Sequence, residues 1–467
     1  MSKKRNQRHV QGPRGEAFLR LTRGVPREQV VCVSIDVHKY YHKVMLLNGY
    51  QEVLEPSFEI DVFRSGFQRL CDVIDRVVAE TEAKVLFIGM EPTGHYFENL
   101  AQHLRSRYPH VRLVNTFAVS QNRGQKMNPK LKTDEIDLGS IGDLVLRNEC
   151  FPYQPLSGDH LHLQNGVRFR RGKVKARTAL RNQIIGHLDR IFPGLVRPNK
   201  DAQGDHPALF AKFWENQTAQ HLIRLCPDPR KLAHMQPAEL VEMFHAHHWR
   251  MGEVTATRII QFAQQVLLPS EEMINARLPY LQYDLMILEA LDGVIAEAEK
   301  QIEHYLAQTE GQILSHIKGV GILHAASYVA GIGNPSHYEH AGQTFKRSGL
   351  ISGRNDSGLH QRAGAGHRVT KVGDPYLRSA LIQITRSLCH WQPYFGQYYA
   401  YLIERGKHPG VAMVATARKA NGVLFALMRD QSEFDPRDEQ GRPILSRTSV
   451  RDPGKETPGR GSCKAKA

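Results

Sequence analysis

Short apolar runs in the first third of the chain predict a mixed α/β domain. Five runs have the length and β-branched content of buried strands: residues 30–37, 42–48, 58–63, 85–92 and 111–117. Helical apolar spacing follows the third run over residues 67–83 and separates the last two runs over residues 97–108. Strands that come first and then alternate with helices are typical of an α/β fold. We expect this domain to span residues 29–155.

The rest of the chain is predominantly helical in its pattern. Apolar residues alternate spacings of three and four, the seam of a helical hairpin or short coiled coil, at Leu288, Leu291, Ile295, Ala298, Ile302 and Tyr305. We expect a basic helical linker with this coiled coil over residues 156–310, and a glycine-rich, mostly helical domain over residues 311–429. Residues 1–28 have no apolar period and predict a mobile basic arm. The polar residues 430–467 predict a disordered tail.

Charge indicates the class of partner. The 467 residues include 62 Lys and Arg against 47 Asp and Glu, a net charge of +15, which favours a polyanionic partner such as nucleic acid. Seven of the basic residues lie in one stretch without an acid: Arg168, Arg170, Arg171, Lys173, Lys175, Arg177 and Arg181. This stretch either lines a nucleic-acid channel or forms a solvated helix face.

Other composition features exclude several classes. No stretch approaches the roughly 18 consecutive apolar residues that span a bilayer, and the N-terminus leads into no apolar signal core. The six cysteines are scattered without a Cys-x-x-Cys pair, so neither a zinc ribbon nor a disulfide scaffold is indicated. We therefore expect a soluble intracellular protein with no membrane partner.

Four carboxylates form the main chemical pattern. Asp36 ends the first strand, and Glu91 ends the strand before a Pro-Thr-Gly turn. Asp134 and Asp137 are three residues apart, which places them on one helix face. Each alone is explained as a turn cap, a surface pair or a helix N-terminal acid. Together they predict a site for Mg²⁺, a hard cation that prefers carboxylate oxygens and serves phosphodiester transfer.

The order of the motifs resembles a known family. The segments that carry the resemblance are SIDVHK, GMEPTGHY, KTDEID, GVG, SGL, DSG and TKVGDPYLRSAL. In this order the chain resembles the DEDD transposases of bacterial insertion sequences, the IS-one-ten group, whose relatives include site-specific DNA invertases. The resemblance covers residues 29–150 and 311–390. It implies an RNase H/RuvC-like N-terminal domain, a helical coiled-coil middle and a mostly helical C-terminal transposase domain.

The resemblance also implies roles for individual residues. By motif position, Asp36, Glu91, Asp134 and Asp137 would bind Mg²⁺, and Ser357 of the Ser-Gly motif would be the nucleophile. Ser352 also precedes a glycine and stays an alternative. Basic residues that could contact nucleic-acid phosphates, or equally serve solubility at the surface, are Arg347, Arg354, Arg368, Lys371 and Arg378 near the serine, and Arg168, Arg170 and Arg171 in the basic stretch.

The implied function is that of a DNA transposase or recombinase that cleaves and rejoins DNA through a serine assisted by Mg²⁺. Relatives form a composite site between protomers, which implies a homo-oligomer, a dimer or tetramer, and they are guided by a structured non-coding (bridge) RNA. Such an enzyme would be cytoplasmic and associated with the nucleoid. One alternative is an RNase H-like metal-dependent nuclease or junction resolvase that uses water as nucleophile. Another is a remnant that only binds nucleic acid, which the presence of all these residues disfavours.

Overall fold

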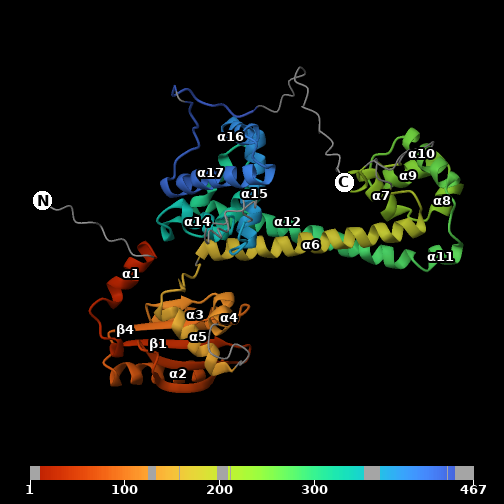
Figure 1. Ribbon diagram of the computed structural model, residues 1–467. Coiled ribbons are helices and arrows are strands. Elements are labelled where there is room, and N and C mark those ends of the chain that lie inside the picture. Colours follow the sequence, from red (N-terminus) through yellow and green to blue (C-terminus); the bar gives the residue numbers. More distant parts are fainter. Residues whose placement is uncertain are drawn as a thin grey trace, which may run out of the picture. The chain divides into compact units, whose positions relative to one another are not determined.

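The computed structural model divides the chain into two compact units, Met1–Pro155 and Leu156–Ala467 (Figure 1). The residues that it describes are 11–124, 133–156, 158–196, 209–210, 212–351, 369–438 and 440–447. Four residues from the sequence analysis lie outside the described residues: Ser352, Arg354, Ser357 and Arg368. Each unit is described by itself.

A sheet forms the centre of the described part of unit 1. Its six strands are β1 (Val30–Val37), β2 (Tyr41–Asn48), β3 (Val53–Asp61), β4 (Val85–Met90), β5 (Val111–Leu113) and β6 (Phe151–Pro152), in the order β3-β2-β1-β4-β5-β6. β1, β4 and β5 are parallel, whereas β2 runs antiparallel to both of its neighbours and β6 runs antiparallel to β5. The predicted mixed α/β fold is confirmed.

β3 begins five residues before the predicted run at Phe58. It is the edge strand and buries only Ile60, so no continuous apolar run marks its start.

Helices cover both faces of the sheet. On one face, α2 (Arg64–Glu80) and α3 (Phe97–Arg107) pack against Val31, Val33 and Ile35 of β1. On the other face, α5 (Asp134–Leu146) packs against Cys32 and Phe87. This division follows from the period of two in a strand, because successive side chains of β1 point to opposite faces. Asp36 therefore lies on the same face as Cys32, below α5.

The basic arm is partly folded, which differs from the expected mobile segment. Residues Pro13–Thr22 form α1, and Phe18 of this helix stacks on Phe87 with ring centroids 5.2 Å apart. The Arg14 guanidinium donates to the Asn148 carbonyl at 2.7 Å. Leu21 and Val25 pack on the same core, and further hydrogen bonds join Gln11 and Arg14 to Arg147 and Asn148. Three apolar residues are too short a pattern to predict this docking from the sequence.

A close contact fixes where α5 lies on the sheet. Gly142 of α5 sits so near β1 and β2 that a Cβ atom there would be 2.5 Å from Leu47 Cδ1 and 2.8 Å from Ser34 Oγ. One turn earlier, Leu138 packs against Met45 and Leu47. Four residues of a helix advance about 6 Å and two residues of a strand advance about 6.7 Å. Each turn of α5 therefore moves along β2 by about two residues. One further turn brings the start of α5 over Lys43.

We expect Gly142→Val to destabilise unit 1 by about 3 kcal/mol, because Ser34 and Leu47 are buried and cannot move aside. Hydrogen exchange of the α5 amides that exchange through unfolding should rise about 100-fold. Gly124→Val is the control: a Cβ atom at Gly124 would meet nothing within 4 Å, so exchange in α5 should stay unchanged. Unchanged exchange in Gly142→Val would show that α5 does not pack this closely on the sheet.

Unit 2 begins with the predicted helical hairpin. α6 (Gly158–Ile191) and α12 (Leu278–Ala307) run alongside each other, with Leu288, Ile295 and Ile302 of the seam buried (Figure 1). Short helices between them form a separate core at one end of the hairpin: η3 (Phe213–Glu215), α7 (Gln217–Leu225), α8 (Pro229–His234), α9 (Pro237–Ala246), α10 (Glu253–Gln265) and α11 (Glu271–Asn275).

The other end of the hairpin joins the C-terminal helices. These are η4 (Glu310–His316), α13 (Ile322–Ile332), η5 (Pro335–His337), α14 (Ala341–Arg347), α15 (Pro375–Trp391), α16 (Pro393–Glu404) and α17 (Pro409–Asp430). Their core includes Leu163 of α6 and Ile302 of α12. Within it, Asn421 of α17 accepts from the Tyr328 hydroxyl at 3.0 Å and donates to the Ala341 carbonyl at 2.8 Å. This buried network fixes α13, α14 and α17 together.

The residues after α17 fold back onto this core as far as Arg447, unlike the expected disordered tail. Phe434 stacks on Phe395 with ring centroids 5.8 Å apart, and the Arg447 amide donates to the Trp391 carbonyl at 2.8 Å. α17 itself is long and apolar enough to cross a membrane by length and composition, but half of its most apolar window is buried inside the structure. It packs with α14, α15 and α16 as a core helix.

Candidate functional site

Two predicted carboxylates lie at neighbouring strand ends. In the parallel pairing of β1 with β4, Ile35 lies beside Met90, so the next residues, Asp36 and Glu91, are neighbours. The Glu91 amide still donates to the Ile35 carbonyl at 3.4 Å. Strand alternation places both acids on the face below α5, on strands about 4.8 Å apart. Carboxyl ends of parallel strands form the usual crevice for a site in such sheets.

The start of α5 brings a third carboxylate to this edge. Lys43 of β2 is the cross-strand partner of Asp36, and its Nζ lies 2.5 Å from Asp134 Oδ2. Thr133 caps the helix by accepting from the Ile136 amide. The hydrogen bond that Lys43 donates to the Asp134 carboxylate raises the pKa of Lys43 above its ordinary value. Asp134 and Asp36 therefore flank the same lysine.

Asp137 is held differently. Its side chain is buried, and its Oδ1 lies 2.5 Å from Arg123 Nη1 at the end of α4 (Thr116–Gly124). Asp36 is 15% exposed, and its Oδ2 lies 3.1 Å from Nε2 of His38. The sequence offered no signal for the partners Lys43 and Arg123, because each lies on a different element from its acid.

The donor set suits a hard divalent cation, since all four predicted ligands are carboxylates. Among the described residues, however, no group of three or more His, Cys, Asp or Glu side chains is close enough to hold an ion. Lys43 and Arg123 provide the positive charge next to Asp134 and Asp137. The residue types thus fit a metal, and binding would require these two acids to exchange their basic partners for the ion.

Residues 352–368, which include Ser352 and Ser357, are called the serine segment. The described residues on its two sides are hydrogen-bonded to each other in unit 2 and form the base of the segment. Backbone amides of residues after the segment donate to carbonyls of residues before it. These hydrogen bonds run from Thr370 to Ile351 at 2.9 Å, from Lys371 to Gly349 at 3.0 Å and from Asp374 to Arg347 at 2.7 Å. Gly349 has a φ of +67° and Gly373 a φ of +149°, which only glycine adopts readily. These hydrogen bonds hold together the residues that precede and follow the serine segment.

Two predicted DNA-contacting arginines support this base. Arg378 donates from Nη1 to the carbonyls of Ser348 and Lys371, both at 3.1 Å. Arg347 donates from Nε to the Gly331 carbonyl at 2.8 Å. Both side chains therefore position the backbone beside the serine segment. Lys371 is exposed.

We expect Gly373→Ala to open this base, because a Cβ atom there would lie 2.3 Å from the Arg347 carbonyl oxygen. The left-handed backbone adds strain of about 1–3 kcal/mol. Hydrogen exchange at the donor amides of Thr370, Lys371 and Asp374 should increase. Gly422→Ala in α17 is the control, since a Cβ atom there would meet nothing within 4 Å and exchange should not change. Equal exchange in both variants would contradict the role of Gly373.

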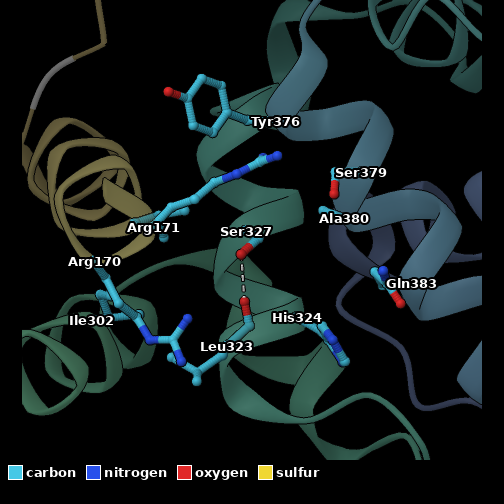
Figure 2. Close-up of a pocket in the computed structure, with 11 residues that line it drawn as sticks. Arg170, Arg171, Ile302, Leu323, His324, Ser327, Tyr376, Ser379, Ala380 and Gln383 are labelled. Atoms are coloured by element: carbon cyan, nitrogen blue, oxygen red, sulfur yellow. Dashed lines mark hydrogen bonds between the residues drawn. The ribbon is translucent and has the colours of Figure 1, made fainter. Parts of the chain in front are cut away.

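The basic stretch lies against the helix that follows the serine segment. A cavity of about 180 Å³ opens between α6, α13 and α15 (Figure 2). The guanidinium groups of Arg168 and Arg171 lie 5.6 and 4.7 Å from the ring centre of Tyr376 in α15. Arg170 pairs with Glu299 of α12, Nε to Oε1, at 2.6 Å. Arg170 and Arg171 both line the cavity, so part of the predicted basic surface lies against α15, which begins at Pro375.

A histidine that the sequence analysis did not single out also lines this cavity. Burial lowers the pKa of His324, and the charge of Arg170 lowers it further. Ser327 of the same helix bonds to the Leu323 carbonyl at 2.6 Å, as Figure 2 shows. Only the fold brings this helix next to the basic stretch, since residues 182–321 separate them in the sequence.

Comparison with known proteins identifies relatives of both units. Residues 33–193, which include all four carboxylates, match the IS110 DEDD family described as transposase, and residues 311–400 match the transposase family of IS116, IS110 and IS902. The chain is 30% identical over 312 residues to the uncharacterized 44.8 kDa protein of insertion element IS116 from Streptomyces clavuligerus, over 65% of this chain and 73% of the relative.

Two further relatives are more distant. The uncharacterized 42 kDa protein of insertion element IS900 from Mycobacterium paratuberculosis is 23% identical over 65% of this chain and 73% of its own length. The uncharacterized 43.6 kDa protein of insertion element IS110 from Streptomyces coelicolor is 23% identical over 56% of this chain and 62% of its own length.

Proposed function

Because the chain belongs to the IS116/IS110/IS902 family of insertion-sequence transposases, we propose that it cleaves and rejoins DNA with a serine nucleophile assisted by Mg²⁺. The observation that carries this proposal is the pairing of Asp36 and Glu91 at adjacent strand ends, below the helix that begins with Asp134. The strand order, an antiparallel hairpin followed by parallel strands, supports an RNase H/RuvC-like domain.

The proposed metal ligands are Asp36, Glu91, Asp134 and Asp137. A bound Mg²⁺ would supply charge that stabilises the attacking and leaving oxygens of phosphoryl transfer. Lys43 pairs with Asp134 and also with Glu59 at 3.4 Å, so it neutralises part of the acidic charge of the strand edge before the ion binds. His38, bonded to Asp36, fixes the orientation of that carboxylate.

The proposed nucleophile is the hydroxyl of Ser357. A bond forms between its oxygen and a DNA phosphorus, the bond from that phosphorus to a deoxyribose oxygen breaks, and the released strand ends in a hydroxyl. The resulting phosphoserine diester conserves the energy of the phosphodiester, so that another DNA hydroxyl can attack it and rejoin the strand. The hydrogen-bonded base at Gly349 and Gly373 supports this proposal, because it holds together the described residues that flank the segment with this serine.

The remaining features of the proposal concern partners. The net charge of +15 suits binding of element-end and target DNA together with a guide RNA. A site composed from two protomers would make the active form a dimer or tetramer, located in the bacterial cytoplasm at the nucleoid. Arg168, Arg170 and Arg171, beside the helix that follows the serine segment, are the proposed phosphate contacts of the hairpin.

The decisive test incubates the full chain with Mg²⁺, end-labelled element-end DNA and co-expressed RNA, and then denatures the sample. We expect a labelled protein–DNA adduct that resists denaturant and disappears on protease treatment. Chelation of the metal should prevent its formation. Cleaved DNA with free ends and no adduct would instead indicate a metal-dependent nuclease or resolvase that uses water. DNA binding without any cleavage would contradict both enzymatic functions.

A further inference from the structure

Unit 1 has a second concave feature, on the face of the sheet opposite to α5. A cavity of about 610 Å³ lies between β2, β3, α2 and α3. His42 of β2 faces it, and because His42 precedes Lys43 in the strand, the two side chains point to opposite faces. His42 pairs across the strands with Val37, which directly follows Asp36. The cavity is therefore close to the carboxylate edge without sharing its residues.

His42, which lines this cavity, carries a buried polar atom that has no partner among the described residues. His42 is 4% exposed, and its Nδ1 makes no hydrogen bond within the described residues. A buried donor or acceptor without a partner destabilises a protein, so such atoms usually meet a ligand or water. The ring nitrogen of a neutral histidine can either donate or accept. His42 Nδ1 can therefore accept a hydrogen bond from a ligand or donate one to it.

Aromatic side chains surround the entrance. Phe63 is 70% exposed at the start of α2, so its ring is accessible to a ligand. Phe67 and Tyr96 form further walls, and the ring of His95 lies 4.4 Å from that of Tyr96. Flat rings that line a cavity suit a flat ligand, because a planar π-system can stack on them.

The charged groups at the cavity favour an anionic ligand. Lys39 and Arg64 are the cationic lining residues, and Asp61 is the acidic one. The Asp61 carboxylate already accepts from the Phe63 amide at 3.0 Å. The Asp61 carboxylate therefore helps to hold the start of α2. The two basic side chains outnumber this one acid at the cavity. A flat polar ring attached to a phosphate matches this combination.

We propose that this cavity binds an unpaired nucleobase of a nucleic-acid strand, stacked on Phe63 and hydrogen-bonded to His42 Nδ1, with the adjoining phosphate near Lys39 and Arg64. The cavity volume lies within the usual range for small-ligand sites, about 300–1,000 Å³. Aromatic stacking combined with basic residues is the general mode of single-strand binding. The proposal rests on the proposed function, since it places an unpaired base next to the strand edge that carries Asp36.

The experiment measures binding of fluorescent single-stranded oligonucleotides to the full chain by anisotropy, with DNA and RNA of the same sequence as separate arms. Loss of one base–aromatic stack should weaken binding of Phe63→Ala about 5- to 150-fold. Phe63→Tyr keeps the ring and should bind like the unsubstituted protein. Tyr50→Ala is the matched control, because Tyr50 is 53% exposed in the β2–β3 turn, outside the cavity.

A second measurement tests stacking directly. An oligonucleotide with 2-aminopurine should lose fluorescence on binding to the unsubstituted protein, and Phe63→Ala should restore it. His42→Phe, which preserves a buried ring but removes both nitrogens, should weaken binding in whichever arm, DNA or RNA, supplies the base. Equal weakening of Phe63→Ala and Tyr50→Ala, or no weakening of either, would overturn the proposal.

Adduct formation separates this inference from the proposed function. If the unsubstituted protein forms the adduct while Phe63→Ala binds single strands normally, only the nucleobase cavity is wrong. If single-strand binding depends on Phe63 but the protein forms no adduct, the cavity stands and the serine mechanism fails. If the protein neither binds single strands nor forms an adduct, both are wrong.

Discussion

Asp36→Asn is expected to reduce DNA strand transfer at least about 10³-fold, equivalent to about 4 kcal/mol of transition-state stabilisation. The substitution keeps the shape of the side chain and removes one negative charge from the strand edge. Its amide oxygen can still accept from His38, the partner of Asp36 at 3.1 Å. Folding stability should therefore change by less than about 1 kcal/mol, and thermal unfolding would measure this. Strand transfer is measured with element-end and target DNA in the presence of Mg²⁺.

The matched control for this substitution is Asp143→Asn on α5. Asp143 accepts from Asn122 at 2.7 Å and pairs with Arg147, and it lies more than two turns from the start of the helix. Its neutralisation should leave strand transfer unchanged. A direct measurement of Mn²⁺ binding by paramagnetic resonance adds a readout besides activity: Asp36→Asn should bind the ion more weakly than Asp143→Asn. Full strand transfer in Asp36→Asn would remove this residue from the metal site.

Ser357→Ala is expected to eliminate the denaturant-resistant protein–DNA adduct completely, together with strand transfer. No other group can replace a missing nucleophile at the same place, so the loss should reach the detection limit of the assay. Binding of element-end DNA should persist, because one small hydroxyl contributes little to an interface held by many basic residues. Gel shifts with the same labelled DNA would confirm this.

Ser352→Ala serves as the counterpart, since Ser352 also precedes a glycine on the same segment. We expect it to form the adduct at a normal level. The reverse result, an adduct in Ser357→Ala and none in Ser352→Ala, would reassign the nucleophile. An adduct that persists in both single variants and in the double variant would exclude a serine of this segment.

Several features could be predicted from the sequence because they depend on local periodicity. The β-branched run at residues 30–37 became β1, and the three–four spacing through Leu288 and Ile302 became the seam of α12. The positions of Asp36 and Glu91 after apolar runs also sufficed to place both at strand ends. Strand and helix periods are properties of neighbouring residues, so they can be read without knowing the fold.

Other features depended on contacts between distant parts of the chain. Phe18 docks α1 on Phe87, and Phe434 returns the C-terminal residues to Phe395, although both segments look irregular in sequence. Only a few apolar side chains anchor each segment, which is too short a pattern to predict the docking from the sequence. The start of β3 at Val53 was missed for a related reason, since an edge strand buries few residues and needs no apolar run.

The sequence by itself determined which chemical groups this protein carries and on which elements they lie. Only the tertiary structure decided their surroundings: Lys43 beside Asp134, Arg123 on Asp137, and the unpartnered Nδ1 of His42 on the opposite face of the sheet. The physical reason is that charge neutralisation and cavity shape arise between side chains of different elements. Their approach depends on packing, such as the close contact at Gly142, and local sequence patterns do not encode it.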